Sequence, residues 1–225
     1  MFDMDLLKNG CDSCGTCCMS GGPALHAEDF DLVASGMLSL NNLVTIRQGE
    51  MVYQPLSDQP EAAEKEFIKI QGRGADWCCM FFDRLSSNCT IYDNRPVACR
   101  LLKCWDTEDI LSITGKRLLS RFDLIKHDDP LLAIVHRHEE ECPVPKMDKI
   151  ALMLDSAEQR DKILEELSRL VNTDLRIRAL AAGDHNLTVS MELFYFGRPI
   201  FQLLVPAGIT CKESLVGLSL NFNSL

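Results

Sequence analysis

The sequence predicts an α+β fold. We expect a small irregular cysteine-rich domain with short antiparallel strands and several helices over residues 1–145, and a C-terminal helix and β-hairpin over 146–225. Three observations predict this organisation. Ten of the eleven cysteines lie in the first segment, and the eleventh is Cys211. Short runs of β-branched and aromatic residues alternate with turn residues in the same segment. In the second segment, an apolar stripe of helical period precedes a run of alternating residues.

The first segment contains several short predicted elements. Apolar spacing and acidic first turns favour helices, and short apolar runs between turn residues favour strands. We expect the first two strands to form a hairpin, and the polar stretch 54–65, with its two prolines, to be an exposed loop. The predicted helices cover residues 28–35, 106–112 and 128–142, and the predicted strands cover 43–47, 51–53, 67–70, 79–82 and 89–92.

The second segment begins with the clearest predicted helix. Ser156 and Gln159 have the spacing of a capping box, and an apolar stripe continues to Val171. Residues 187–205 alternate on both sides of a Gly-Arg-Pro turn, which predicts a β-hairpin. The tail after Gly208 predicts one further strand.

Composition and charge exclude several classes of protein. Apolar residues make up 46% of the chain and charged residues 25%, which is ordinary for a globular protein. The chain has a formal net charge of −10, whereas nucleic-acid binding needs a basic surface. No apolar run approaches the roughly 18–20 residues of a membrane span, and the first ten residues do not resemble a secretory signal. We therefore expect a cytoplasmic protein with neither a nucleic-acid nor a membrane partner.

Cysteines in such a chain indicate metal binding, because disulfides are rare in the reducing cytosol. Three of them, Cys11, Cys14 and Cys17, are each separated by two residues. Bacterial ferredoxins supply three thiolates to one iron–sulfur cluster with this spacing. A single zinc ion more often takes cysteine pairs from two separated loops. The loop therefore favours an iron–sulfur cluster over zinc, and zinc stays the alternative.

Two adjacent cysteine pairs need separate consideration. Cys18 follows Cys17 directly, and neighbouring side chains rarely converge on one small target. Cys18 could face a second metal or a substrate, or be a small buried side chain. If residues 77–82 are a strand, Cys78 and Cys79 point to opposite faces, so only one of them should face a metal.

At these residues the sequence resembles the YkgJ-type cysteine-cluster family, which is described as zinc- or iron-chelating. The matching motifs are Cys-x2-Cys-Gly-x-Cys-Cys at 11–18, Cys-x-Phe-Phe at 79–82, and Cys-Thr-Ile-Tyr-Asp-Asn-Arg-Pro-x-x-Cys-Arg at 89–100, with Cys104 after them. The acidic pair Glu28 and Asp29 also matches the place where that family starts a helix. The resemblance covers roughly residues 8–105. The family pattern has one cysteine at this doublet, and its spacing from the phenylalanines aligns it with Cys79 rather than Cys78.

The resemblance implies that these cysteines bind a metal or a cluster. Arg95 and Arg100 flank Cys99, and their charges would stabilise an anionic cluster, although an ordinary surface ion pair is an equally open interpretation. Cys142 is added because a cysteine followed by proline completes ferredoxin-type runs. The predicted metal ligands are Cys11, Cys14, Cys17, Cys18, Cys79, Cys89, Cys99, Cys104 and Cys142.

Two functional classes remain open from the sequence. The first is an iron–sulfur protein, with a cluster of the 4Fe-4S type, that exchanges electrons with a protein partner or a small molecule. Whether it is an enzyme stays open, and an iron–sulfur oxidoreductase or part of one is the class that fits. The second is a zinc- or iron-chelating module without catalysis that folds around its metal and binds a partner. The sequence does not indicate an oligomeric state.

Overall fold

The structure, a computed structural model, describes residues 10–214 and 217–222. It confirms the α+β class. Helices are combined with short strands, and each sheet in the described part of the chain consists of two antiparallel strands. Among the described residues, no helix combines the length and apolar character that a membrane crossing requires.

The first strands pair differently from the prediction. β1 (Leu43–Ile46) pairs with β4 (Phe67–Ile70), and β2 (Met51–Gln54) pairs with β3 (Gln59–Ala62). The predicted β1–β2 hairpin is therefore wrong. The stretch 54–65 is largely exposed as predicted, but its residues 59–62 form a strand instead of a loop. The reason is burial: all four residues of β1 are buried, and it joins the apolar β4, whereas β2 and β3 form an exposed ribbon.

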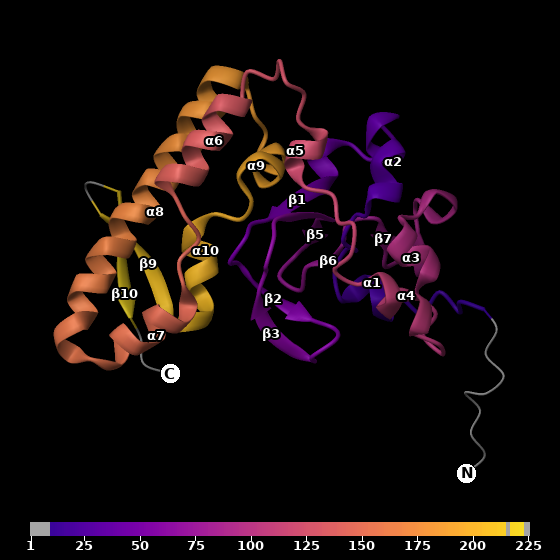
Figure 1. The fold of residues 1–225 in the computed structure, drawn as a ribbon, viewed down its shortest axis with the longest axis horizontal. Helices are drawn as coiled ribbons and strands as arrows, with labels where there is room; N and C mark the ends of the chain where they lie inside the picture. Colours follow the sequence, from indigo (N-terminus) through magenta and orange to yellow (C-terminus); the bar gives the residue numbers. More distant parts are fainter. Residues whose placement is uncertain (1–9, 215–216, 223–225) are drawn as a thin grey trace, which may run out of the picture.

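The cysteine-bearing part consists of very short elements around turns. β5 (Gly72–Arg73) pairs with β6 (Cys78–Cys79), and β7 (Phe82–Asp83) pairs with β8 (Asn88–Cys89) around a turn. The helices of this part surround these strands in Figure 1. They are α1 (Thr16–Met19), η2 (Ala27–Asp29), α2 (Phe30–Ala34), α3 (Val97–Leu101), α4 (Glu108–Ile113) and α5 (Arg121–Leu124), with η3 (Leu40–Asn42) before β1 and η4 (Tyr92–Asn94) before α3.

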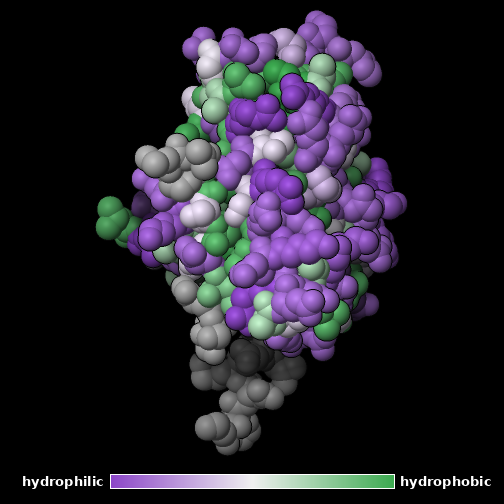
Figure 2. All heavy atoms as spheres, turned by 90° about the vertical axis from the view of Figure 1, so that its left-hand side faces the viewer, coloured by the Kyte–Doolittle hydropathy of each residue, from purple (hydrophilic) through white to green (hydrophobic). Residues whose placement is uncertain are grey.

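The other side of the molecule is helical. The long helix α8 packs against α6, α7 and the terminal hairpin, at the left of Figure 1. Hydrophilic side chains dominate the face seen in Figure 2, which is this left-hand side of the molecule. The elements are α6 (Leu132–Glu141), α7 (Met147–Asp155), α8 (Ala157–His185), α9 (Val189–Phe196), α10 (Ile200–Leu204), η5 (Val205–Ala207), β9 (Ile209–Ser214) and β10 (Gly217–Phe222).

Residues 187–205 form two helices, so the hairpin predicted there is wrong. The side chain of Thr188 caps α9 by accepting a hydrogen bond from Met191 N at 3.2 Å. Phe194, Tyr195 and Phe196 are all buried, which a strand with one solvated face does not allow. The C-terminal hairpin is instead β9–β10.

The predicted capping box at the start of α8 is also absent. Ser156 makes no side-chain capping bond, and its backbone carbonyl accepts from Gln159 N at 3.1 Å. The helix itself is present and runs well beyond Val171, to His185.

The two segments on either side of residue 145 share one hydrophobic core. α9 packs against β1, and Thr45 Oγ1 donates to the carbonyl of Phe194. The division into domains 1–145 and 146–225 stays a prediction, and any such domains are joined by buried contacts.

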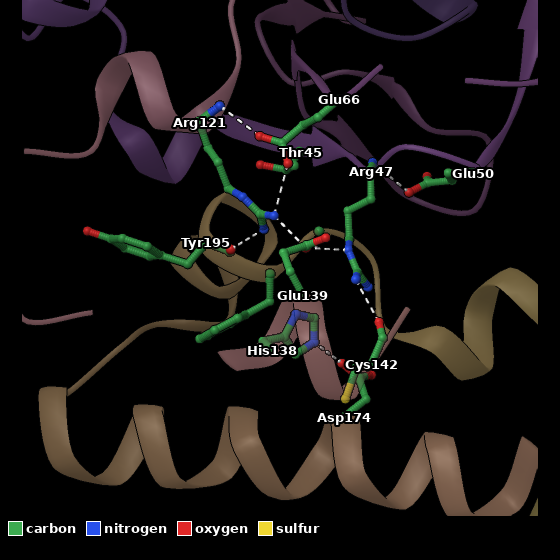
Figure 3. Close-up of polar contacts among 12 residues, drawn as sticks. Thr45, Arg47, Glu50, Glu66, Arg121, His138, Glu139, Cys142, Asp174 and Tyr195 are labelled. Carbon is green, nitrogen blue, oxygen red and sulfur yellow. Dashed lines mark hydrogen bonds and ion pairs between the residues drawn. The ribbon is translucent and has the colours of Figure 1, made fainter. Parts of the chain in front are cut away.

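A buried ionic network crosses this junction (Figure 3). Arg47 and Arg121, both almost fully buried, share the carboxylate of Glu139. Arg121 Nη1 also donates to the carbonyl of Tyr195 at 2.5 Å. Removing one partner of such a pair leaves an uncompensated buried charge, so the network fixes how the segments fit together.

His138 and Asp174 form the deepest part of this network. His138 Nε2 lies 2.7 Å from Asp174 Oδ1, which also accepts from Arg178 Nε at 2.7 Å. Burial lowers the pKa of His138, and the nearby charges of Arg47 and Arg178 lower it as well. Asp174 raises this pKa but does not outweigh them. Burial alone would raise the pKa of Asp174, but His138 and Arg178 outweigh it and hold that pKa below its usual range.

This arrangement predicts a pH dependence. The pKa of His138 is lower in the folded than in the unfolded state, so acid protonates the unfolded state first. The free energy of unfolding should therefore fall as pH drops through about 6.5, the ordinary histidine value. We expect His138→Gln to lose less stability than the wild type between about pH 7 and 5.5 in urea titrations. The same change at exposed His136 is the control, and an unchanged slope in His138→Gln would contradict the assignment.

Candidate metal centre

The cysteine loop, residues 11–18, rests on the ring of Phe82. Gly15 is buried in this loop and has a φ of 76°, in the left-handed region that favours glycine. A Cβ at position 15 would overlap the Phe82 ring. The glycine thus permits both the turn before α1 and the close packing of the loop on Phe82.

Helix α1 brings two thiols together. Cys17 Sγ and Cys18 Sγ lie 3.9 Å apart, although successive helical side chains diverge by about 100°. α1 also packs against β6, the strand that carries Cys79. The first cysteine loop therefore lies beside the second cysteine segment.

Asp29 positions the helix that carries Cys99. Its carboxylate is fully buried and accepts from His26 N at 2.9 Å and from Val97 N at 2.8 Å. Val97 is the first residue of α3. One carboxylate thereby ties the segment after the cysteine loop to the N-terminus of α3.

Five cysteines form one group, which we call the thiol cluster. The pKa of Cys99 is raised to about 12, first by burial and then by the negative charges of the neighbouring Cys79, Cys17 and Cys89. Burial likewise raises the pKa of Cys18, with contributions from Cys17, Cys79 and Cys89. Such mutual effects require proximity. The members, Cys17, Cys18, Cys79, Cys89 and Cys99, come from α1, β6, β8 and α3.

Three other predicted ligands are exposed. Cys11 and Cys14 lie in the cysteine loop, and Cys104 follows α3. Cys11 Sγ accepts from Ser13 N at 3.4 Å, and Cys14 Sγ lies 3.3 Å from Thr16 Oγ1. The structure does not place them among the electrostatic neighbours of Cys18 or Cys99, so their role as ligands stays a prediction.

Cys142 lies apart from the other predicted ligands, and its role as a ligand stays a prediction. It ends α6, is fully buried, and lies next to Asp174 in Figure 3. Burial raises its pKa to about 12, and its electrostatic neighbours are Asp174, Arg47, Glu141 and Arg178 rather than other thiols. In Figure 1, α6 is on the opposite side of the molecule from α1 and α3. The hydrophobic core and the ionic network hold Cys142 away from the thiol cluster.

The two predicted cofactor-binding arginines differ in their surroundings. The guanidinium of Arg95 lies 3.6 Å from the centroid of the Tyr92 ring, and its Nε donates to Tyr92 O at 2.8 Å. The charge of Arg95 lowers the pKa of Cys99, against the larger effect of burial. Arg100 is exposed. A role for either in binding a cofactor stays a prediction.

Cys78 is buried but has different neighbours from Cys79. It contacts Arg84, whereas Cys79 influences Cys18 and Cys99. Both cysteines border a cavity of about 330 Å³ between β6 and β7, whose rim includes Arg73 and Arg84. The two thiols are also electrostatic neighbours, since the charge of Cys78 raises the pKa of Cys79.

The thiol cluster matches the chemistry of thiolate-bound metals. In the described part of the chain, no three His, Cys, Asp or Glu side chains are already arranged to hold one metal ion. The fit therefore depends on the donor set: soft sulfur ligands are those that zinc and iron–sulfur clusters take in proteins. Cys17, Cys18, Cys79, Cys89 and Cys99 would hold the metal.

Sequence reasoning did not identify the positioning role of Asp29 or of Phe82. Asp29 looked like part of an acidic helix start, and its bond to Val97 spans 68 residues of sequence. The Cys-x-Phe-Phe motif was visible, but nothing in it indicated that the second phenylalanine supports Gly15.

Replacing Gly15 should disturb the loop. Gly15→Ala places a Cβ against Phe82 in a left-handed conformation, and we expect a loss of about 1–3 kcal/mol together with lower metal content. Gly36→Ala is the control, because Gly36 has a φ of 78° with nothing within 4 Å of its added Cβ. Urea unfolding and metal analysis measure both variants. Equal losses of stability in the two variants would show that the contact with Phe82 is irrelevant. Adding Phe82→Leu to Gly15→Ala should restore part of the lost stability, because the smaller side chain leaves room for the Cβ.

Replacing Asp29 should loosen α3. In Asp29→Asn, one of the two backbone donors faces an amide N–H, which costs about 1–3 kcal/mol for a buried group. We expect lower stability and weaker metal retention at Cys99. Glu28→Gln, at the exposed neighbouring position, should change neither. Wild-type metal content in Asp29→Asn would exclude the positioning role.

Comparison with known families identifies this part of the chain. The model of the CxxCxxCC family, described as "Putative zinc- or iron-chelating domain", matches residues 10–117. No curated protein and no solved structure matches the chain at a significant level. The matched residues include every member of the thiol cluster, together with Gly15, Asp29 and Phe82. Residues 10–117 of this chain are therefore similar to the CxxCxxCC family of metal-chelating domains.

Proposed function

We propose that this chain is an iron–sulfur protein with a redox or electron-transfer role, and that the thiol cluster holds its iron. One observation carries the proposal: five cysteines from four separate elements lie within electrostatic reach of one another. A zinc ion and an iron–sulfur cluster each take four protein ligands, so the group provides enough thiols for either. The two-residue spacing of Cys11, Cys14 and Cys17 favours the iron–sulfur cluster.

The position of the thiol cluster suits electron exchange. Cys17 is exposed, Cys18, Cys89 and Cys99 are partly buried, and Cys79 is buried. A redox group held there would be shielded on one side and accessible on the other. A protein partner or a small molecule could approach the exposed side without a change of fold.

Each part of the site has a defined task in this proposal. The cysteines supply thiolate ligands, Gly15 and Phe82 seat the loop, and Asp29 holds α3 in place. The charge of Arg95 favours the thiolate form of Cys99. An iron–sulfur cluster, when bound, would supply a one-electron redox centre whose potential depends on nearby charge and solvent exposure.

One observation favours the second candidate, a zinc-chelating module without catalysis. The 3.9 Å between Cys17 Sγ and Cys18 Sγ is close to the edge of a tetrahedron with Zn–S distances of about 2.3 Å. In that case the metal would contribute folding energy, and the remaining surface would serve to bind a partner.

The test is the metal content of cysteine variants. Protein purified without oxygen should contain iron and acid-labile sulfide, and Cys17→Ser and Cys99→Ser should each lose most of both. Cys142→Ser and Cys211→Ser should keep the metal, since Cys142 lies in the core and Cys211 is exposed on β9.

The outcomes separate the candidates. Stoichiometric zinc without sulfide would replace the iron–sulfur proposal by the zinc module. Full metal retention in Cys99→Ser would remove the thiol cluster from the site, and metal loss in Cys142→Ser would restore that residue as a ligand.

A further inference from the structure

Lys69 is a charged residue next to the thiol cluster that neither the sequence motifs nor the family description assigns. It lies on β4 between Val44 of β1 and Ala24, the residue with which it forms an isolated bridge. Its neighbours Ile68 and Ile70 are buried in the core, so the side chain of Lys69 points to the opposite face.

The ammonium group lies between the two cysteine segments. A Cβ built on Gly21, just after the cysteine loop, would be 3.8 Å from Lys69 Nζ and 3.5 Å from the carbonyl of Trp77. Trp77 directly precedes the Cys78–Cys79 strand. Lys69 therefore reaches the place where the end of the first cysteine segment meets the start of the second.

This ammonium has no carboxylate partner in the described part of the chain. The lysine ion pairs found there belong to Lys103, and no side-chain hydrogen bond of Lys69 is present. Burial lowers the pKa of Lys69, Arg198 lowers it further, and Glu50 and Cys79 oppose them. A poorly solvated cation without a partner costs free energy, so the metal-free protein is destabilised at this position.

We propose that Lys69 supplies the counter-charge of the metal–thiolate centre. A metal ion with four thiolate ligands, like an iron–sulfur cluster, carries a net negative charge. Such a centre at Cys79 would compensate Lys69, and Lys69 would in turn stabilise the thiolates. Lys69 is thus a positioning residue that acts through electrostatics, and this inference rests on the proposed metal centre.

The arginines near the thiol cluster are less suited than Lys69 to act as the counter-charge, because they already have other partners. The guanidinium of Arg95 is already engaged by the ring and carbonyl of Tyr92. Arg84 forms an ion pair with Asp76. The charge of Arg73 lowers the pKa of Cys79, but Arg73 is exposed and donates to the carbonyl of Phe82 at 3.2 Å. Lys69 is half-buried and makes no ion pair in the described residues, and the negative charges that act on it are Glu50 and Cys79.

The experiment compares two properties of the full-length chain. Lys69→Met keeps the aliphatic stem and removes the charge, Lys69→Arg keeps the charge, and Lys65→Met changes an exposed lysine nearby. The first property is the urea midpoint of the reduced, metal-free protein. The second is the affinity for Zn²⁺, used as the probe and measured by competition with a chelator.

The two properties of Lys69→Met should move in opposite directions. Without metal, the variant should be at least as stable as the wild type, because an uncompensated charge is gone. With Zn²⁺, its affinity should fall by about tenfold, the lower range for residues that support metal ligands. Lys69→Arg should recover most of the affinity, and Lys65→Met should match the wild type in both measurements.

Other outcomes overturn the inference. An unchanged Zn²⁺ affinity in Lys69→Met would refute it while leaving the metal centre intact. A variant that is less stable without metal would show that Lys69 serves packing. A wild-type chain that binds neither zinc nor iron would overturn the proposed function, and the counter-charge with it.

Discussion

The close approach of five thiols is the constraint on which the cysteine-rich side of the molecule depends. Thiolates in one partly buried group repel one another, and burial and this repulsion together raise the pKa values of Cys18 and Cys99. Without a cation the thiols favour their neutral form. In the proposed metal centre, a bound metal would remove this penalty and join α1, β6, β8 and α3, which are elements of only two to five residues.

The rest of the chain provides the rigid support for this group. Asp29 and the Gly15–Phe82 contact hold the ligand segments in place from within the cysteine-rich part. Behind it, α9 packs on β1, and the shared carboxylate of Glu139 ties Arg47 to Arg121. The cysteine loop thus belongs to a molecule whose core holds largely paired polar groups.

The limits of sequence reasoning have physical causes. The α+β class and the metal-chelating family could be predicted, because the cysteine spacings and short apolar runs are local signals. The Arg47–Glu139 pair spans 92 residues, so no local pattern reveals it. Residues 187–205 alternate like a strand, but tertiary burial of three consecutive aromatic residues favours α9. The cysteine–proline pair at 142–143 resembled a ligand motif, while the ionic network keeps Cys142 in the core.

The central claim is that the thiol cluster holds iron as an iron–sulfur cluster. X-ray absorption at the iron edge, on protein purified without oxygen, tests it most directly because it reports the atoms around the metal. We expect a first shell made of sulfur and a second shell containing iron. A first shell of nitrogen or oxygen, or a preparation whose metal is zinc with four sulfur ligands, would contradict the claim.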